Sequence, residues 1–152
     1  MTLMLRKNIF KLASVLVCLG LVAGFFLWRS SYKNKIEPNQ ILIRGHVFKT
    51  EIVTTDNDKQ KGLGGRKSIC NDCGMLFVFA RPAEYTFWMK DMLFALDILW
   101  LRDDKIVFIE KNVAPNFLGT MKPSSEASRV LELNAGNVDK FGIVVGDSVL
   151  MN

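Results

Sequence analysis

The chain has 152 residues, enough for one domain with a substantial core but not for a cofactor domain beside a substrate domain. Its formal net charge is +5, yet six of its 20 basic residues precede residue 36, where no acidic residue occurs. Residues 36–152 therefore contain 14 basic and 15 acidic residues, which argues against a nucleic-acid partner. The single histidine, His46, excludes any metal site or mechanism that needs two.

Residues 12–28 form the most apolar stretch of the chain, with 14 apolar residues among 17 and no charge. As a helix this stretch would be about 25 Å long, close to the hydrocarbon thickness of a bilayer. A basic start and an apolar run are also typical of a cleaved signal peptide, but no small-residue cleavage site follows. We therefore predict a basic tail over residues 1–11 and a transmembrane anchor, or uncleaved signal, over residues 12–28 that contacts membrane lipid.

The orientation of this anchor is less constrained, because three basic residues flank it on each side. A short basic tail before a first apolar segment usually stays in the cytoplasm. We thus expect a single-pass protein of the cell membrane whose C-terminal domain lies outside the cytoplasm. Residues 29–40 are mostly polar and include Pro38, which indicates a tether before a domain over residues 41–152.

The domain contains seven short apolar or alternating runs at the spacing of a compact β-sandwich or barrel. They are residues 47–53, 75–79, 85–90, 96–101, 106–110, 129–133 and 148–151. The polar residues 102–105 between two of these runs predict a hairpin.

Two short helices are also indicated. Thr55 is suited to cap a helix that continues through Lys61 and ends at Gly62, and Asn134 is suited to cap one that ends at Gly142. The predicted fold is mainly β: a single-domain barrel or sandwich of about seven short strands with one or two short helices, preceded by the transmembrane helix.

Cys70 and Cys73 have the spacing of half a zinc site, a redox dithiol or a local disulfide. The third cysteine, Cys18, lies in the predicted anchor, so the domain lacks the four ligands of a zinc site. We predict no metal and no cofactor. A redox motif should open a helix, whereas the predicted strand 75–79 follows almost directly. Outside the cytoplasm, a disulfide between Cys70 and Cys73 is the favoured reading.

Charged residues interrupt the apolar runs at Lys90, Asp97 and Glu132. A charge is costly to bury unless it is paired or faces water, so these residues either lie on solvated faces, form structural ion pairs or share a pocket. On the pocket hypothesis they converge with Arg66 on a cavity walled by Trp88, and these five residues form the predicted ligand-binding site.

No catalytic motif accompanies this constellation. The serines and threonines lack a GxSxG turn, and the chain has no Walker lysine or HExxH element. The segment Gly62–Arg66 lacks the ending of a phosphate loop and is typical of a tight turn. We therefore predict no catalytic residue and favour a binding domain for a small anionic ligand, a partner segment or a membrane-protein partner.

Two alternatives remain open at this point. An acid–base enzyme of hydrolase type would use Glu132 or Asp97 as general base and Lys90 to stabilise negative charge. A structural accessory of a membrane complex would need neither role.

Several sequence blocks together resemble the domain-of-unknown-function 192 family over about Val47 to Leu150. The blocks are Gly62-Leu63-x-Gly65-Arg66, Gly74 to Phe79, Phe87 to Asp91, Leu96 to Leu99, Val130 to Gly136, and Gly142-Ile143 followed by Gly146-Asp147. The resemblance implies a mainly β fold and no established reaction. Gly64 and Ala95 depart from the family pattern, which usually has a larger residue and a proline at these positions.

Overall fold

The computed structural model describes residues 36–151, which form one curled seven-stranded sheet, a small two-stranded sheet and two short helices. The prediction of a mainly β fold with two short helices is confirmed. The predicted tail and anchor and most of the predicted tether lie outside the described residues. Within residues 36–151, no helix has the length and apolar character needed to cross a membrane.

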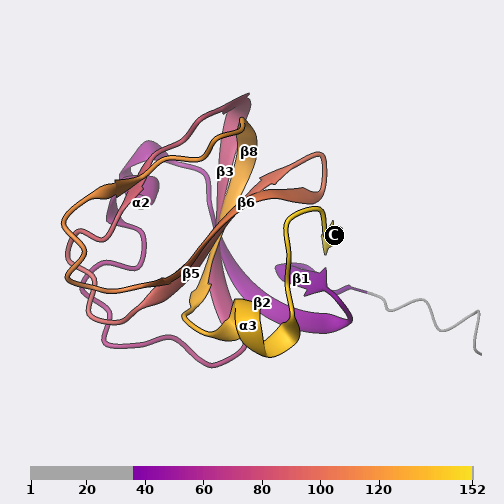
Figure 1. Ribbon diagram of the computed structural model, residues 1–152, viewed down its shortest axis with the longest axis horizontal. Coiled ribbons are helices and arrows are strands. Elements are labelled where there is room, and N and C mark those ends of the chain that lie inside the picture. Colours follow the sequence, from indigo (N-terminus) through magenta and orange to yellow (C-terminus); the bar gives the residue numbers. More distant parts are fainter. Residues whose placement is uncertain (1–35, 152) are drawn as a thin grey trace, which may run out of the picture. The chain divides into compact units, whose positions relative to one another are not determined.

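The large sheet has the spatial order β6-β5-β8-β3-β2-β1-β9. Its strands are β1 (Gln40–Ile43), β2 (His46–Val53), β3 (Cys73–Ala83), β5 (Leu96–Arg102), β6 (Lys105–Val113), β8 (Ala127–Asn134) and β9 (Val149–Met151). The β2–β3 pair is parallel and the other pairs are antiparallel. Figure 1 shows β3 and β8 side by side in the middle of the sheet.

The two ends of this sheet meet because it curls strongly. Lys105, at the start of β6, forms a bridge with Ser148, which directly precedes β9. The backbone N–H of Ile106 donates to the carbonyl oxygen of Asp147 at 3.0 Å, and that of Val149 donates to Asp104 at 2.8 Å. The sheet is therefore a half-barrel rather than a flat layer with two free edges.

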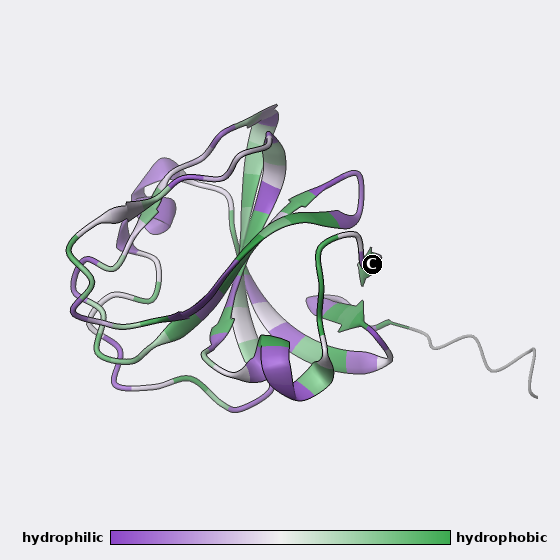
Figure 2. Ribbon diagram, viewed as in Figure 1, coloured by the Kyte–Doolittle hydropathy of each residue, from purple (hydrophilic) through white to green (hydrophobic). Residues whose placement is uncertain are grey.

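Both faces of the central strands are buried. Along β5 the six residues from Leu96 to Leu101 are all buried, and alternate side chains enter different cores because successive residues of a strand point to opposite faces. The first core contains Phe48, Leu76, Leu99, Leu101, Leu131, Leu133 and Val138, and the second contains Leu63, Met75, Phe77, Met89, Ile98, Trp100 and Val130. Strands such as β2, with one solvated face, show the alternation of purple and green in Figure 2.

The small sheet pairs β4 (Phe87–Trp88) with β7 (Thr120–Met121), and it contributes Met121 to the second core. Helix α2 (Asp56–Lys61) lies in the connection between β2 and β3, and α3 (Asn137–Phe141) follows β8. In Figure 1 the two helices lie on different sides of the central strands, with α2 to the left and α3 below.

The predicted boundaries of α2 are confirmed. The Thr55 hydroxyl accepts a hydrogen bond from the backbone N–H of Asp58 at 3.2 Å, and the helix ends at Gly62. The end of α3 at Gly142 is also confirmed, but Asn134 as its N-cap is wrong. The N-cap is Gly136, since the Asn134 side chain is used elsewhere: its amide donates to the carbonyl oxygen of Cys70 at 2.8 Å.

Most predicted strands are present, and the hairpin is confirmed as β5 and β6 joined at Asp103 and Asp104, which both have positive φ. The predicted strand over residues 85–90 is reduced to the two residues of β4. Strands β1 and β7 were not predicted. β7 has only two residues, too few to show the alternation of apolar and polar side chains that marks a strand. β1 has only four residues and directly follows the polar segment that was predicted as a tether.

Gly74 of β3 is required by the close approach of β8. A Cβ atom at this position would lie 2.6 Å from the carbonyl oxygen of Glu132 and 2.8 Å from Cδ2 of Leu133. We expect Gly74→Ala to lower the free energy of unfolding by about 3 kcal/mol, the upper part of the usual overpacking range, because the obstructing atom belongs to the backbone. Urea unfolding of the full chain in detergent measures this loss.

The control for this substitution is Gly45→Ala. A Cβ there meets nothing within 4 Å, and only the positive φ of 79° is unfavourable. We expect a loss of about 1 kcal/mol from that strain alone. A loss at Gly74 no larger than that at Gly45 would contradict the close approach.

Candidate functional site

A cavity of about 400 Å³ opens on the face of the sheet that carries the second core. Its base is Glu132 of β8, and we call it the Glu132 pocket. The apolar walls come from the loop after α2, from β3, and from the segment around β4: Leu63, Phe77, Phe79, Tyr85, Phe87 and Met92. The mouth carries Asp56, Lys59, Lys61, Trp88 and Lys90.

Glu132 is buried because of its place in the sheet. It lies opposite Met75 of β3 and Ile98 of β5, both of them buried, and only 5% of its own surface is exposed. Among residues 36–151 its carboxyl group has no hydrogen-bond or ion-pair partner. Burial away from water raises the pKa of Glu132 to about 8, so this carboxyl is mostly protonated at neutral pH.

The aromatic walls of the pocket are fixed by their mutual contacts. Phe79 stacks on Tyr85 with 3.5 Å between ring centroids, and Phe87 meets the edge of Phe77 at 4.9 Å. The indole N–H of Trp100 donates to the carbonyl oxygen of Tyr85 at 2.8 Å, which holds the segment before β4 against the core. The cavity is therefore preformed, as small-molecule sites usually are.

The mouth has an excess of positive charge. The Lys59 ammonium lies 4.8 Å from the centroid of the Phe79 ring and 3.9 Å from the Asp56 carboxylate. Within the described part of the chain, Lys61 and Lys90 have no ion-pair partner. An anionic group at the mouth would therefore meet two lysines that are not already neutralised.

Three of the five predicted site residues line this pocket: Trp88, Lys90 and Glu132. Trp88 is 49% exposed at the mouth, while Glu132 is at the base. Asp97 and Arg66 do not line it, so the expected convergence of all five is wrong. Asp97 lies opposite Leu133 in the β5–β8 pair, one position from the Ile98–Glu132 pair, and this register directs Asp97 and Glu132 to opposite faces.

Asp97 is fully buried and bonded to backbone groups on both sides. Oδ1 accepts from the backbone N–H of Asn112 and Oδ2 from that of Val138, each at 2.8 Å. Val138 is in the first turn of α3, whose N-cap Gly136 offers no side chain, so Asp97 caps this helix from β5. Asn112 lies where the β5–β6 register shifts. Such a bulge leaves a backbone N–H without a partner in the ladder, and Asp97 accepts the hydrogen bond from it.

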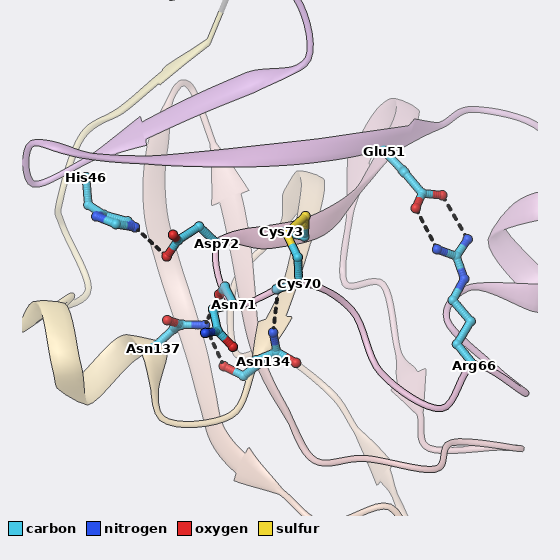
Figure 3. Close-up of a disulfide and its surroundings, with 9 residues drawn as sticks. All are labelled: His46, Glu51, Arg66, Cys70, Asn71, Asp72, Cys73, Asn134 and Asn137. Carbon is cyan, nitrogen blue, oxygen red and sulfur yellow. Dashed lines mark hydrogen bonds and ion pairs between the residues drawn. A yellow bond between two sulfur atoms is a disulfide. The ribbon is translucent and has the colours of Figure 1, made fainter.

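Arg66 forms a surface ion pair with Glu51, shown at the right of Figure 3. Its Nη1 and Nη2 donate to the two carboxylate oxygens at 2.5 and 2.8 Å. These hydrogen bonds hold the pKa of Glu51 below its usual range. The pair borders a separate hollow of about 430 Å³ and contributes little to stability, because both side chains are exposed to solvent.

Cys70 and Cys73 are joined by a disulfide in the structure. Figure 3 shows the surrounding loop fastened to the end of β8 and to α3. The Asn134 amide donates to the Cys70 carbonyl oxygen at 2.8 Å, and the Asn137 amide donates to that of Asn71 at 3.2 Å. This loop does not line the Glu132 pocket. The disulfide is therefore a structural feature of the corner between β8 and α3.

The lysines of α2 and the aromatic walls of the Glu132 pocket were not predicted from the sequence. Phe77 and Phe79 alternate with Val78 in β3, which is a signal that they share a face with Met75. The sequence of Gly62–Arg66 indicates only a tight turn, but in the structure this segment brings Leu63 into the cavity. No local pattern shows that α2 and Glu132 of β8 line the same cavity, because that depends on which strands are neighbours.

The family model DUF192, described as Uncharacterized ACR, matches residues 39–151. The chain belongs to this family, as the sequence blocks predicted. A comparison with curated proteins finds no match.

Two crystal structures are similar to the described fold. One is a protein of unknown function from Novosphingobium aromaticivorans, with 28% identity, a TM-score of 0.71, and coverage of 78% of this chain and 89% of the other. The second is a protein from Sinorhizobium meliloti described as a proposed transcription regulator, with 29% identity, a TM-score of 0.69, and coverage of 73% and 89%.

The buried carboxyl predicts a pH dependence of stability. The folded protein keeps the Glu132 proton up to about pH 8, whereas the unfolded chain releases it near pH 4.5, so the folded state binds more protons between these values. The contribution of this group to the free energy of unfolding therefore falls as pH rises, by about 1.4 kcal/mol per pH unit, and levels off above the folded pKa.

Glu132→Gln isolates this effect, because the amide stays neutral and has a similar shape. Urea unfolding of the full chain at pH 5, 6 and 7 should give a flatter stability profile for the variant and a growing advantage over the wild type. Parallel profiles would show that Glu132 titrates normally.

Asp97→Asn tests the cap on α3. The new amide NH₂ must face one of the two backbone N–H donors, of Asn112 or Val138, and leaves it unpaired in the interior. We expect a loss of about 2 kcal/mol in the free energy of unfolding. The matched control is Asp103→Asn in the exposed turn, which should change stability by less than about 0.5 kcal/mol. Equal effects at the two positions would contradict the structural role of Asp97.

Proposed function

We propose that this protein is a binding domain that takes a small molecule into the Glu132 pocket. The observation that carries the proposal is the carboxyl group at the base of the cavity, 5% exposed and without a partner among residues 36–151. No enclosed side-chain nitrogen or oxygen in the described residues lacks a hydrogen-bond partner, so the unpaired oxygens of Glu132 face the cavity itself. A ligand in the cavity can therefore form hydrogen bonds with this carboxyl group.

The size and lining of the cavity support a small ligand rather than a folded partner. Its volume of about 400 Å³ lies in the lower part of the range of small-molecule sites. The walls supply apolar and aromatic contact, Trp88 covers part of the mouth, and Lys90 attracts an anionic group. This combination of apolar walls and a few converging polar groups is typical of a binding site.

Residues 12–28 are proposed to tether this domain to the cell membrane, with the pocket outside the cytoplasm. The apolar run and its basic flanks support the tether, and the disulfide between Cys70 and Cys73 fits an oxidising compartment. The domain would then meet its ligand close to the membrane surface.

An acid–base enzyme is the second candidate, since the raised pKa of Glu132 suits a general acid or base. Asp97 is not available to it, because both of its carboxylate oxygens are held by backbone N–H groups on the other face of the sheet. Such an enzyme would depend on Glu132 and Lys90.

Nucleic-acid binding is not proposed, although the Sinorhizobium meliloti protein is described as a proposed transcription regulator. The 14 basic and 15 acidic residues of positions 36–152 leave no basic excess to bind phosphates.

Saturation-transfer NMR on the full chain in detergent micelles tests the binding function. A mixture of small amines, carboxylic acids, amino acids and sugars should contain compounds that bind the wild type. Glu132→Gln should weaken their binding at least tenfold while the protein stays folded. Lys90→Met should weaken binding of the anionic compounds several-fold.

The matched control is Glu126→Gln, on an exposed residue that pairs with Arg102 and does not line the pocket. This variant should bind as the wild type does. No binding, or equal binding to the Glu132 and Glu126 variants, would contradict the proposal. Conversion of a bound compound during the measurement, lost in Glu132→Gln, would identify an enzyme instead.

A further inference from the structure

We infer that the ligand is a small zwitterion, with an ammonium group held against Glu132 and the aromatic walls and an acidic group held at the mouth by Lys61 and Lys90. This inference rests on the binding function proposed for the pocket. It names the class of molecule that satisfies both ends of the cavity at once.

The base of the pocket favours an ammonium group. Glu132 is the carboxyl group there, and an ionised carboxylate only accepts hydrogen bonds, so its best partner is a cationic donor. The rings of Tyr85 and Phe87 line the same space, and aromatic faces attract cations. Phe79 is not available for this contact, because its ring stacks on Tyr85 and the Lys59 ammonium lies 4.8 Å from its centroid.

The mouth favours the opposite charge. Lys61 and Lys90 are without ion-pair partners in residues 36–151, and Lys59 adds a third positive charge beside them. The nearby acid, Asp56, is fully exposed and is 3.9 Å from Lys59. A ligand that carried only an ammonium group would be repelled by these lysines, whereas an attached acidic group would pair with them.

The walls between the two ends restrict what joins them. Leu63, Phe77 and Met92 line this section with apolar side chains, while Gln60 and Thr86 are the uncharged polar residues of the same cavity besides Tyr85. A short chain of methylene groups or an aromatic ring fits this section.

Binding of the ammonium group should release a proton below pH 8. Burial holds the Glu132 carboxyl protonated in the empty pocket, and it must ionise to pair with the ligand. The other charged and titratable groups that face the cavity are Asp56, Lys59 and Lys61 from α2, Tyr85 before β4, and Lys90 after it. The carboxylate and ammonium groups of an amino acid keep their charges between pH 6 and 8.

Affinities of three probes for the full chain in detergent micelles test the inference. The probes are 6-aminohexanoate, hexanoate and hexylamine, measured by saturation-transfer titration, with 4-aminobutanoate added to vary the spacing of the charges. We expect one of the amino acids to bind at least tenfold more tightly than hexanoate or hexylamine. Its affinity should rise about tenfold from pH 6 to pH 7, because Glu132 is then more often ionised.

Variants assign each end of the ligand. Glu132→Gln should remove the preference for the amino acid over hexanoate, and the double variant Lys61→Met with Lys90→Met should remove the preference over hexylamine. Glu126→Gln, the control away from the pocket, should keep both preferences.

The outcomes separate the inference from the proposed function. If hexanoate, hexylamine or a neutral compound binds as tightly as the amino acids and depends on Glu132, the pocket is a binding site but the zwitterion inference is overturned. If nothing binds in a manner that depends on Glu132, both fail. Ethanolamine phosphate headgroups carry the same pair of charges. If dihexanoylphosphatidylethanolamine binds and none of the soluble amino acids does, the ligand is a lipid headgroup, and the inference of a small soluble zwitterion is overturned.

Discussion

Burial of one carboxyl group without a partner is the constraint on which the site depends. Glu132 is the residue of β8 between Met75 of β3 and Ile98 of β5, so the pairing of three central strands places it in the second core. The surrounding side chains are apolar, and they raise its pKa rather than pair with it. The aromatic walls and the lysines of the mouth line the same cavity as this carboxyl group, whose oxygens face the cavity.

The sheet has two buried carboxyl groups, Asp97 and Glu132, in different surroundings. Asp97 faces the first core, where two backbone N–H groups satisfy its oxygens and it fixes the start of α3 and the bulge of β6. Glu132 faces the second core and opens into a cavity instead. The first arrangement contributes stability, and the second lowers stability at neutral pH relative to a carboxyl group with an ordinary pKa.

Local patterns predicted much of this fold. Alternation located the long strands, Thr55 and Gly62 marked the ends of α2, and charges within apolar runs pointed to Lys90, Asp97 and Glu132. What could not be predicted depends on strand neighbours and register. In the β5–β8 register Asp97 pairs with Leu133 and Ile98 pairs with Glu132, so Asp97 and Glu132 point to opposite faces. The tertiary fold also brings residues of α2 to the cavity that Glu132 lines. The pairing of Arg66 with Glu51 across 15 residues is likewise a product of the tertiary fold.

The Glu132 carboxyl is buried, has no partner among residues 36–151 and is mostly protonated at neutral pH. Carbon-13 NMR of the full chain, labelled at the side-chain carboxyl of glutamate and assigned by comparison with Glu132→Gln, measures this directly in a titration from pH 4 to pH 10. We expect one glutamate signal with a midpoint near pH 8. A midpoint for Glu132 near its ordinary value of 4.5 would contradict it.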